Sequence, residues 1–256
     1  MTDNSRDVEA RAAGILRDLE ADVSLIGKSH RAWWLKYLRT HLDIYVDVLR
    51  LVRRHVVRGR LLEIGSVPGH LTVLLKRLGY DMDAVDLDPS RMQALYVKHD
   101  IRVRPLDIET QALPFEEAAF DGVLATELLE HLRLNPLFAL AEMRRVLRPG
   151  GVILLSVPNI TPVHRLRFLF GRDYQGDPVE EFRKIETLGH MGHIRLYSPN
   201  DVRRFLEATG FTNVSHCYRG KVQGGWKGKL IRLLLPGREK WRAYLFSTAR
   251  KPEDTA

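Results

Sequence analysis

Three acidic residues, Glu63, Asp86 and Asp107, stand where three short apolar runs of the sequence end. Such runs, alternating with helical patterns, predict buried strands of a parallel sheet, whose carboxyl ends meet along one ligand-binding edge. A carboxylate at that edge can accept hydrogen bonds from hydroxyl groups, each contributing about 1.5–3 kcal/mol. Asp86 follows Gly65 by about 20 positions, where nucleotide-binding folds carry an acid that meets ribose hydroxyls. Any one acid could be a helix cap or a solvated charge, but three successive strand ends predict a nucleotide-type site.

The segment after the first apolar run is a candidate ligand loop. It reads GSVPG over residues 65–69, and its two glycines mark positions where a backbone turns or approaches a ligand closely. We expect the helix that follows to leave free backbone N–H groups pointing at the ligand. A dinucleotide fingerprint is excluded, because Val67 and His70 stand where its second and third glycines are required. The alternative is an ordinary strand-to-helix turn.

The loop resembles the first motif of class I S-adenosylmethionine-dependent methyltransferases, which is an acidic residue followed by three glycines at alternate positions. Glu63, Gly65 and Gly69 match this motif, while Val67 replaces the middle glycine. A β-branched residue before proline favours an extended backbone, and Pro68 removes one N–H donor. We therefore expect a variant, more extended loop with one donor fewer.

Further matching segments follow in order along the chain: Asp107, Leu113-Pro114-Phe115, Phe120-Asp121, Glu130-His131 and the run 146–151. Together with the loop they resemble the small-molecule branch of class I methyltransferases (type 11/12-like), which includes enzymes that methylate quinones, sugars and lipids. The resemblance extends from about residue 60 to 159 and resumes from 193 to 214.

The resemblance implies S-adenosylmethionine as the cofactor and gives each strand end a role. The implied cofactor-binding residues are Glu63, Gly65, Ser66 and Gly69 at the methionine end, Asp86 and Leu87 at the ribose, Asp107 and Ile108 at the adenine, and Thr126 and Glu127 beneath the sulfonium. Asp121 and the turn at residues 149–151 are expected to be structural.

Methyl transfer from a sulfonium is an in-line displacement, so the protein mainly positions the acceptor and, for a hydroxyl, removes its proton. Histidine is the usual base near neutral pH. His131 and His193 are the candidate catalytic residues, and the sequence does not choose between them. The structural alternatives are a packing role for His131 and a polar loop position for His193. His190 and His193 invite a metal site, but Glu186 is a weak third ligand, so we expect no metal.

Alternating strand and helix patterns predict an α/β fold: a doubly wound, mostly parallel, seven-stranded Rossmann-like sheet. The strands are expected at 60–64, 83–87, 101–106, 120–125, 152–157, about 213–218 and about 243–249, and the main helices at 5–27, 32–57, 71–80, 89–98 and 136–147. We expect a helical cap at 1–58 and a methyltransferase domain at 59–256. In the cap, Trp33 and Trp34 could cover a pocket or simply pack on the sheet.

Two segments depart from the family pattern and are expected to be insertions. The first, about 160–192, follows the fifth strand and could form a lid over the acceptor. The second, about 219–241, combines Trp226, leucines and basic residues, which suits contact with an anionic membrane. The alternative is a hairpin whose leucines cover the core.

Composition narrows the class of protein. Of 256 residues, 40 are basic and 32 acidic, and all of the excess lies in 160–256, where 18 basic residues face 10 acidic ones. A single cysteine, Cys217, excludes an internal disulfide and a multi-cysteine zinc site. There is no run of 18 apolar residues and the first residues are polar, so we expect a cytoplasmic protein, with peripheral contact at the inner membrane face as an alternative.

The sequence thus predicts an enzyme that methylates a small molecule, at an oxygen of a sugar, quinone or lipid-linked precursor. One alternative is a nucleic-acid methyltransferase, but no base-reading motif accompanies the basic charge, and we do not expect a nucleic-acid partner. The other is a protein that binds the cofactor without catalysis, which the Val67-Pro68 loop leaves open.

Overall fold

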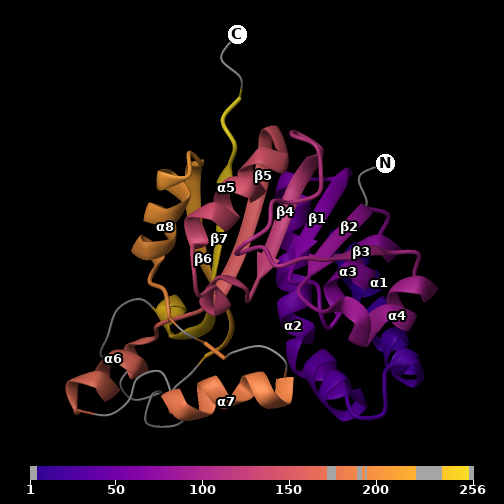
Figure 1. Cartoon of the computed structure of the whole chain (residues 1–256), viewed down its shortest axis with the longest axis horizontal. Coiled ribbons are helices and arrows are strands. Elements are labelled where there is room, and N and C mark those ends of the chain that lie inside the picture. The colour runs from indigo at the N-terminus through magenta and orange to yellow at the C-terminus, as the bar shows by residue number, and fades with distance from the viewer. Residues whose placement is uncertain (1–4, 172–176, 189–191, 194, 223–237, 254–256) are drawn as a thin grey trace.

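The computed structural model describes residues 5–171, 177–188, 192–193, 195–222 and 238–253. They contain a seven-stranded sheet in the order β3-β2-β1-β4-β5-β7-β6, with helices on both faces (Figure 1). The strands are β1 (Arg60–Ile64), β2 (Asp81–Asp86), β3 (Arg102–Pro105), β4 (Phe120–Thr126), β5 (Leu147–Pro158), β6 (Thr212–Val222) and β7 (Arg242–Arg250). Strands β1 to β5 run parallel, and β7 pairs antiparallel with β5 and β6. The fold class predicted from the sequence is confirmed.

The helices are α1 (Ser5–Asp18), α2 (Arg31–His55), α3 (His70–Arg77), α4 (Gln93–Lys98), α5 (Pro136–Val146), α6 (Pro162–Leu169), α7 (Pro178–Leu188) and α8 (Pro199–Ala208). Short 3₁₀ helices are η1 (Leu19–Leu25), η2 (Pro89–Met92), η3 (Leu129–His131) and η4 (Arg238–Trp241). The helix expected at 5–27 is thus α1 followed by η1, and Gly14 lies inside α1 without breaking it.

The parallel strands are buried on both faces, as their nearly continuous apolar sequences require. Helices α1 to α4 share one core cluster with alternate strand residues, among them Leu61, Leu124 and Leu154. Helices α5 and α8 share the second cluster with the intervening residues, among them Leu62, Val123 and Ile153. Since α1 and α2 belong to a core that also includes α3 and α4, the cap is packed directly on the sheet, and its division from the rest at residue 58 stays a prediction.

The helix starts show why these segments fold locally. The Asp88 carboxylate accepts the backbone N–H of Ser90 and so caps the start of η2. Asn135 accepts the N–H groups of Leu137 and Phe138 at the start of α5. Strand β5 begins at Leu147, which pairs with Phe120, so strand pairing starts before the Gly150 turn and not after it as the sequence predicts.

Candidate cofactor and acceptor site

The loop between β1 and α3 requires glycine at both positions where the sequence has it. Gly65 and Gly69 have φ of 76° and 89°, a region that side chains strongly disfavour. A Cβ on Gly69 would also lie 2.9 Å from Leu95 Cδ2. The peptide bond between Val67 and Pro68 is cis.

The N–H groups of this loop are used inside the protein. Those of Gly65 and Ser66 donate to the Val85 carbonyl at 2.9 and 3.4 Å, and that of Val67 donates to Asp86 Oδ2 at 2.9 Å. The N–H of the last loop glycine bonds within the loop. The N–H groups of the loop itself are therefore not free, because the neighbouring strand β2 and the loop supply their acceptors. Free N–H groups at the start of α3 stay a prediction.

Helix α2 contacts the loop and the start of α3. The Trp34 indole N–H donates to the Pro68 carbonyl at 3.0 Å, and its ring lies 4.3 Å from the His70 ring, centroid to centroid. Tyr45 Oη and His70 Nδ1 are 3.0 Å apart. Burial lowers the pKa of His70 to about 3, so the ring is neutral. Trp34 therefore positions the loop as well as packing on the sheet. The signal in the sequence is that a buried indole N–H needs an acceptor.

Glu63 and Asp86 lie close together beneath the loop. Glu63 is 3% exposed and accepts the Thr72 hydroxyl at 2.5 Å. Burial raises the pKa of Glu63 to about 8, and the charge of Asp86 adds to the shift. Asp86 accepts the N–H groups of Val67 and Asp88, at 2.9 and 3.0 Å. Burial raises the pKa of Asp86 as well.

Strand β3 brings the third acid to the same edge, because Asp86 pairs with Pro105 in the sheet register. Asp107 Oδ1 accepts the Glu109 N–H at 3.0 Å. The neighbouring Ile108 side chain is buried in the second core cluster, so only its backbone can face a ligand. Leu87 directly follows Asp86 and is 55% exposed, so its apolar side chain is accessible to a ligand.

Two acids with different surroundings follow strand β4. Glu127 has φ of 51° and accepts the Ser156 hydroxyl at 2.7 Å. Burial raises the pKa of Glu127 to about 7. Glu130 is completely buried, and within the described ranges neither of its carboxylate oxygens has a hydrogen-bond partner. Thr126 pairs with Ser156 and ends the strand.

The two candidate catalytic histidines come together although they lie far apart in the sequence. The rings of His131 and His193 are 5.0 Å apart, centroid to centroid. His131 Nδ1 lies 3.1 Å from the Gly192 carbonyl, and the His193 backbone N–H donates to Glu181 Oε2 at 2.8 Å. His190 lies outside the described residues, and Glu186 is exposed on α7.

Aromatic side chains of α2 lie near the acids that follow β4, because the charges of Glu127 and Glu130 act on Tyr37, and the sequence did not assign them to the site. Tyr37 stacks on His41 with centroids 3.8 Å apart. Burial, together with the charges of Glu127 and Glu130, raises the pKa of Tyr37. The helical spacing of aromatic residues in this helix was the only signal.

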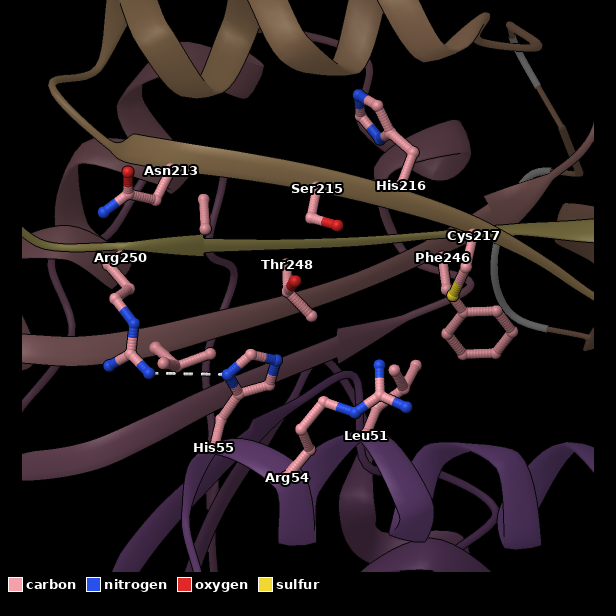
Figure 2. A pocket seen from close by; sticks show the side chains of 12 residues that line it. Leu51, Arg54, His55, Asn213, Ser215, His216, Cys217, Phe246, Thr248 and Arg250 are labelled. Atoms are coloured by element: carbon pink, nitrogen blue, oxygen red, sulfur yellow. Dashed lines mark hydrogen bonds between the residues drawn. The ribbon is translucent and has the colours of Figure 1, made fainter.

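A cavity of about 380 Å³ lies elsewhere, between the end of α2 and the strands β5, β6 and β7 (Figure 2). Arg54 and His55 reach toward it from α2, and Arg250 reaches toward it from β7 (Figure 2). Val152, which also lines it, pairs with Gly122 near the start of β4. The cavity therefore lies toward the amino ends of the parallel strands, and none of the predicted site residues lines it.

The expected insertion at 160–192 contains α6 and α7, which lie beyond the carboxyl edge of the sheet (Figure 1). Phe168, Leu169 and Phe170 are 66%, 75% and 79% exposed. The segment expected to touch a membrane, 219–241, lies mostly outside the described residues. None of the described helices combines the length and apolarity that a membrane span requires.

Comparison with known proteins gives the class. The chain matches the model of a methyltransferase domain family over residues 36–216. A ubiquinone biosynthesis O-methyltransferase of Xanthomonas campestris pv. campestris is 31% identical over 121 residues, covering 45% of this chain and 50% of that protein. A protein of Mycolicibacterium smegmatis, named as a probable S-adenosylmethionine-dependent methyltransferase, is 30% identical over 196 residues, covering 75% of this chain and 65% of that protein. The chain thus spans about half the length of the first curated relatives it matches.

Solved structures share the fold at low identity. A Thermotoga maritima S-adenosylmethionine-dependent methyltransferase superposes with a TM-score of 0.60 at 17% identity, covering 87% of this chain and 96% of that one. A Burkholderia thailandensis 1,6-didemethyltoxoflavin-N1-methyltransferase, solved with 1,6-didemethyltoxoflavin and S-adenosylhomocysteine, gives 0.53 at 20% identity, covering 82% and 78%.

The sheet order and these similarities define a class I methyltransferase fold, a class whose cofactor is S-adenosylmethionine. The chain belongs to the methyltransferase domain family, and the resemblance found in the sequence is confirmed.

Proposed function

We propose that this protein transfers the methyl group of S-adenosylmethionine to a small-molecule acceptor, at an oxygen of a sugar, quinone or lipid-linked precursor. The observation that carries the proposal is the meeting of three acids, Glu63, Asp86 and Asp107, at the ends of three adjacent parallel strands in a chain of this family. Similarity to ubiquinone O-methyltransferases supports an oxygen acceptor.

In this proposal each strand end holds one part of the cofactor. Asp86 accepts the ribose hydroxyls through lone pairs that its two backbone donors leave over, with Leu87 beside the sugar. Asp107 and the Ile108 backbone face the adenine. The ammonium of the methionine end meets the loop at Ser66, over the buried Glu63. Thr126 and Glu127 lie beneath the sulfonium.

The reaction then needs only positioning and one proton acceptor. The acceptor oxygen forms a bond to the methyl carbon while the carbon–sulfur bond breaks, and the electron pair stays on sulfur to give S-adenosylhomocysteine. The proton of the acceptor hydroxyl passes to an imidazole of the His131–His193 pair, whose rings meet edge to face with centroids 5.0 Å apart. The α6–α7 insertion covers the acceptor, and its exposed Phe168, Leu169 and Phe170 favour an apolar or lipid-linked one.

The test is calorimetric titration of S-adenosylhomocysteine into the wild type and Asp86→Ala. We expect micromolar binding that the substitution weakens about tenfold or more, which corresponds to about 1.4 kcal/mol. Asp88→Ala is the matched control, because Asp88 caps η2 and is exposed. No binding to folded wild type would reject the proposal. Binding without turnover on quinone or sugar precursors would favour the catalytically silent alternative, and tight, salt-sensitive RNA or DNA binding would favour the nucleic-acid alternative.

A further inference from the structure

We propose that Glu130, His131 and His193 form a binding site for a divalent transition-metal ion. Each offers one ligand atom, a carboxylate oxygen or an imidazole nitrogen, and these atoms all lie within 4.8 Å of one another. Glu130 and His131 belong to η3, whereas His193 lies in the segment after α7. The fold therefore brings together three ligands of two types from two distant parts of the chain.

Glu130 is the residue that most strongly indicates a bound cation. Its side chain is 0% exposed, and neither carboxylate oxygen has a hydrogen-bond partner in the part of the chain that the structure describes. A buried carboxylate without partners is one of the costliest groups a fold can contain. A metal ion would satisfy both oxygens and the charge at once.

His131 is oriented as metal-binding histidines are. Its Nδ1 lies 3.1 Å from the Gly192 carbonyl, which can only accept, so a neutral His131 carries its proton on Nδ1. The lone pair is then on Nε2, the nitrogen that a metal ion would use. Metal-ligating histidines usually donate their other N–H to a carbonyl or carboxylate in this way.

His193 is held in place by α7. Its backbone N–H donates to Glu181 Oε2 at 2.8 Å, and Lys184 Nζ holds both oxygens of that carboxylate at 2.6 Å. Gly192 lies so close that a Cβ would be 1.7 Å from Glu181 Oε2. Only glycine allows this approach without moving the helix side chain, so the segment that carries His193 is fixed against α7.

Two imidazoles and one carboxylate suit zinc, cobalt, manganese or ferrous iron better than magnesium or calcium, which prefer oxygen ligands. Three protein ligands also leave coordination positions open for water or for an acceptor oxygen. A metal ion there would lower the pKa of a bound acceptor hydroxyl, and this would replace proton transfer to His131 or His193, whose lone pairs the ion would occupy. That catalytic role rests on the proposed methyl transfer, whereas metal binding itself does not. This site differs from the expected absence of a metal, which was judged from His190, His193 and Glu186 and not from Glu130.

Cobalt(II) is the probe, titrated into full-length protein first treated with a chelator. We expect one equivalent to bind, with visible absorption from nitrogen and oxygen ligands. Glu130→Gln and His193→Gln should each weaken binding about tenfold or more. His216→Gln is the control, because His216 is a half-buried histidine of β6 that bonds Ser247 and has no part in the cluster. Zinc at about a hundredfold excess over its Kd should raise the thermal midpoint of the wild type by about 5–10 °C, and that of Glu130→Gln by much less.

Two results would overturn the proposal: no stoichiometric cobalt binding by folded wild type, or binding that Glu130→Gln and His193→Gln leave unchanged. Glu130→Gln keeps the shape of the side chain, so we expect it to fold. If it does not, His193→Gln, at a half-buried position, decides by the same titration. S-adenosylhomocysteine binding is measured in every variant. Loss of that binding in the wild type counts against the methyl transfer and leaves the cobalt result standing.

Discussion

Glu63 and Asp86, at the ends of β1 and β2, accept hydrogen bonds from the chain, whereas Glu130, just beyond β4, accepts none among the described residues. All three side chains are at most 9% exposed, so the difference lies in their partners and not in their burial. The Thr72 hydroxyl donates to Glu63, and the Val67 backbone N–H donates to Asp86.

We call the side of β1 and β2, where Glu63 and Asp86 have hydrogen-bond donors, the finished half of the edge. The side beyond β4, around Glu130, is the unfinished half. On the side of β1 and β2, the chain fixes the loop and the acids before any ligand arrives, which is preorganised binding. Beyond β4, the buried Glu130 carboxylate has no hydrogen-bond partner among the described residues, and one ligand atom each of His131 and His193 lies within 4.8 Å of it. Buried polar groups that a fold leaves unsatisfied often mark function.

Removal of the Trp34 side chain should destabilise the finished half more than any other change described below. Trp34→Ala deletes a completely buried ring and the donor to the Pro68 carbonyl, so we expect a loss of about 3–5 kcal/mol in the free energy of unfolding. Urea denaturation measures it. Trp33→Ala, at the next and only partly buried position, should cost much less; equal losses would mean that α2 packs without bracing the loop.

The protonation of Glu63 should make stability depend on pH. Burial raises its pKa from 4.5 to about 8, so the folded state holds the proton more tightly than the unfolded state. The stability from that proton is complete below about pH 4.5 and is lost as the pH rises through about 8. We expect wild type to lose about 2–4 kcal/mol between about pH 5 and pH 9, and Glu63→Gln to lose distinctly less.

Glu142→Gln is the matched control for this pH series. The hydrogen bond from Arg145 lowers the pKa of Glu142, so its contribution is present above its ordinary pKa and disappears as the pH falls. The variant should keep the decline at high pH. A wild-type profile that stays flat from about pH 5 to pH 9 would show that Glu63 is solvated or paired in solution.

The sequence predicted the finished half better than the unfinished one, for a physical reason. Strands β1 to β4 follow from local apolar runs, and their order along one edge follows from right-handed crossovers. The bond from Trp34 to Pro68 joins residues 34 positions apart, and the contact of His131 with Gly192 joins residues 61 apart. No local pattern encodes such pairs. Nor does the sequence show that acceptors on β2 bind the loop N–H groups, because that depends on the orientation of the Asp86 carboxylate.

A methyl group on Gly69 should weaken the finished half by a smaller amount. Gly69→Ala forces a side chain into φ of 89° and against Leu95, so we expect a loss of about 1–3 kcal/mol in unfolding free energy, with weaker S-adenosylhomocysteine binding. Gly14→Ala is the control: it lies in α1 with no atom within 4 Å of the new Cβ, and alanine there should stabilise by about 0.5–1 kcal/mol. Denaturation curves of the two variants should therefore shift in opposite directions, and a Gly69→Ala protein as stable as wild type would contradict the tight loop.

Substitution of Gly192 should have the smallest effect on stability. It should also distinguish the two halves of the edge most clearly. A Cβ there meets the end of the Glu181 side chain, which can swing away, so Gly192→Ala should change the free energy of unfolding by less than about 1 kcal/mol. The swing removes the carboxylate that holds the His193 backbone and shifts the carbonyl that His131 contacts. We therefore expect unchanged S-adenosylhomocysteine affinity together with reduced cobalt affinity and slower methyl transfer. If the same substitution weakened S-adenosylhomocysteine binding as much as Asp86→Ala does, the two halves of the edge would be one coupled site, and the distinction between them would fail.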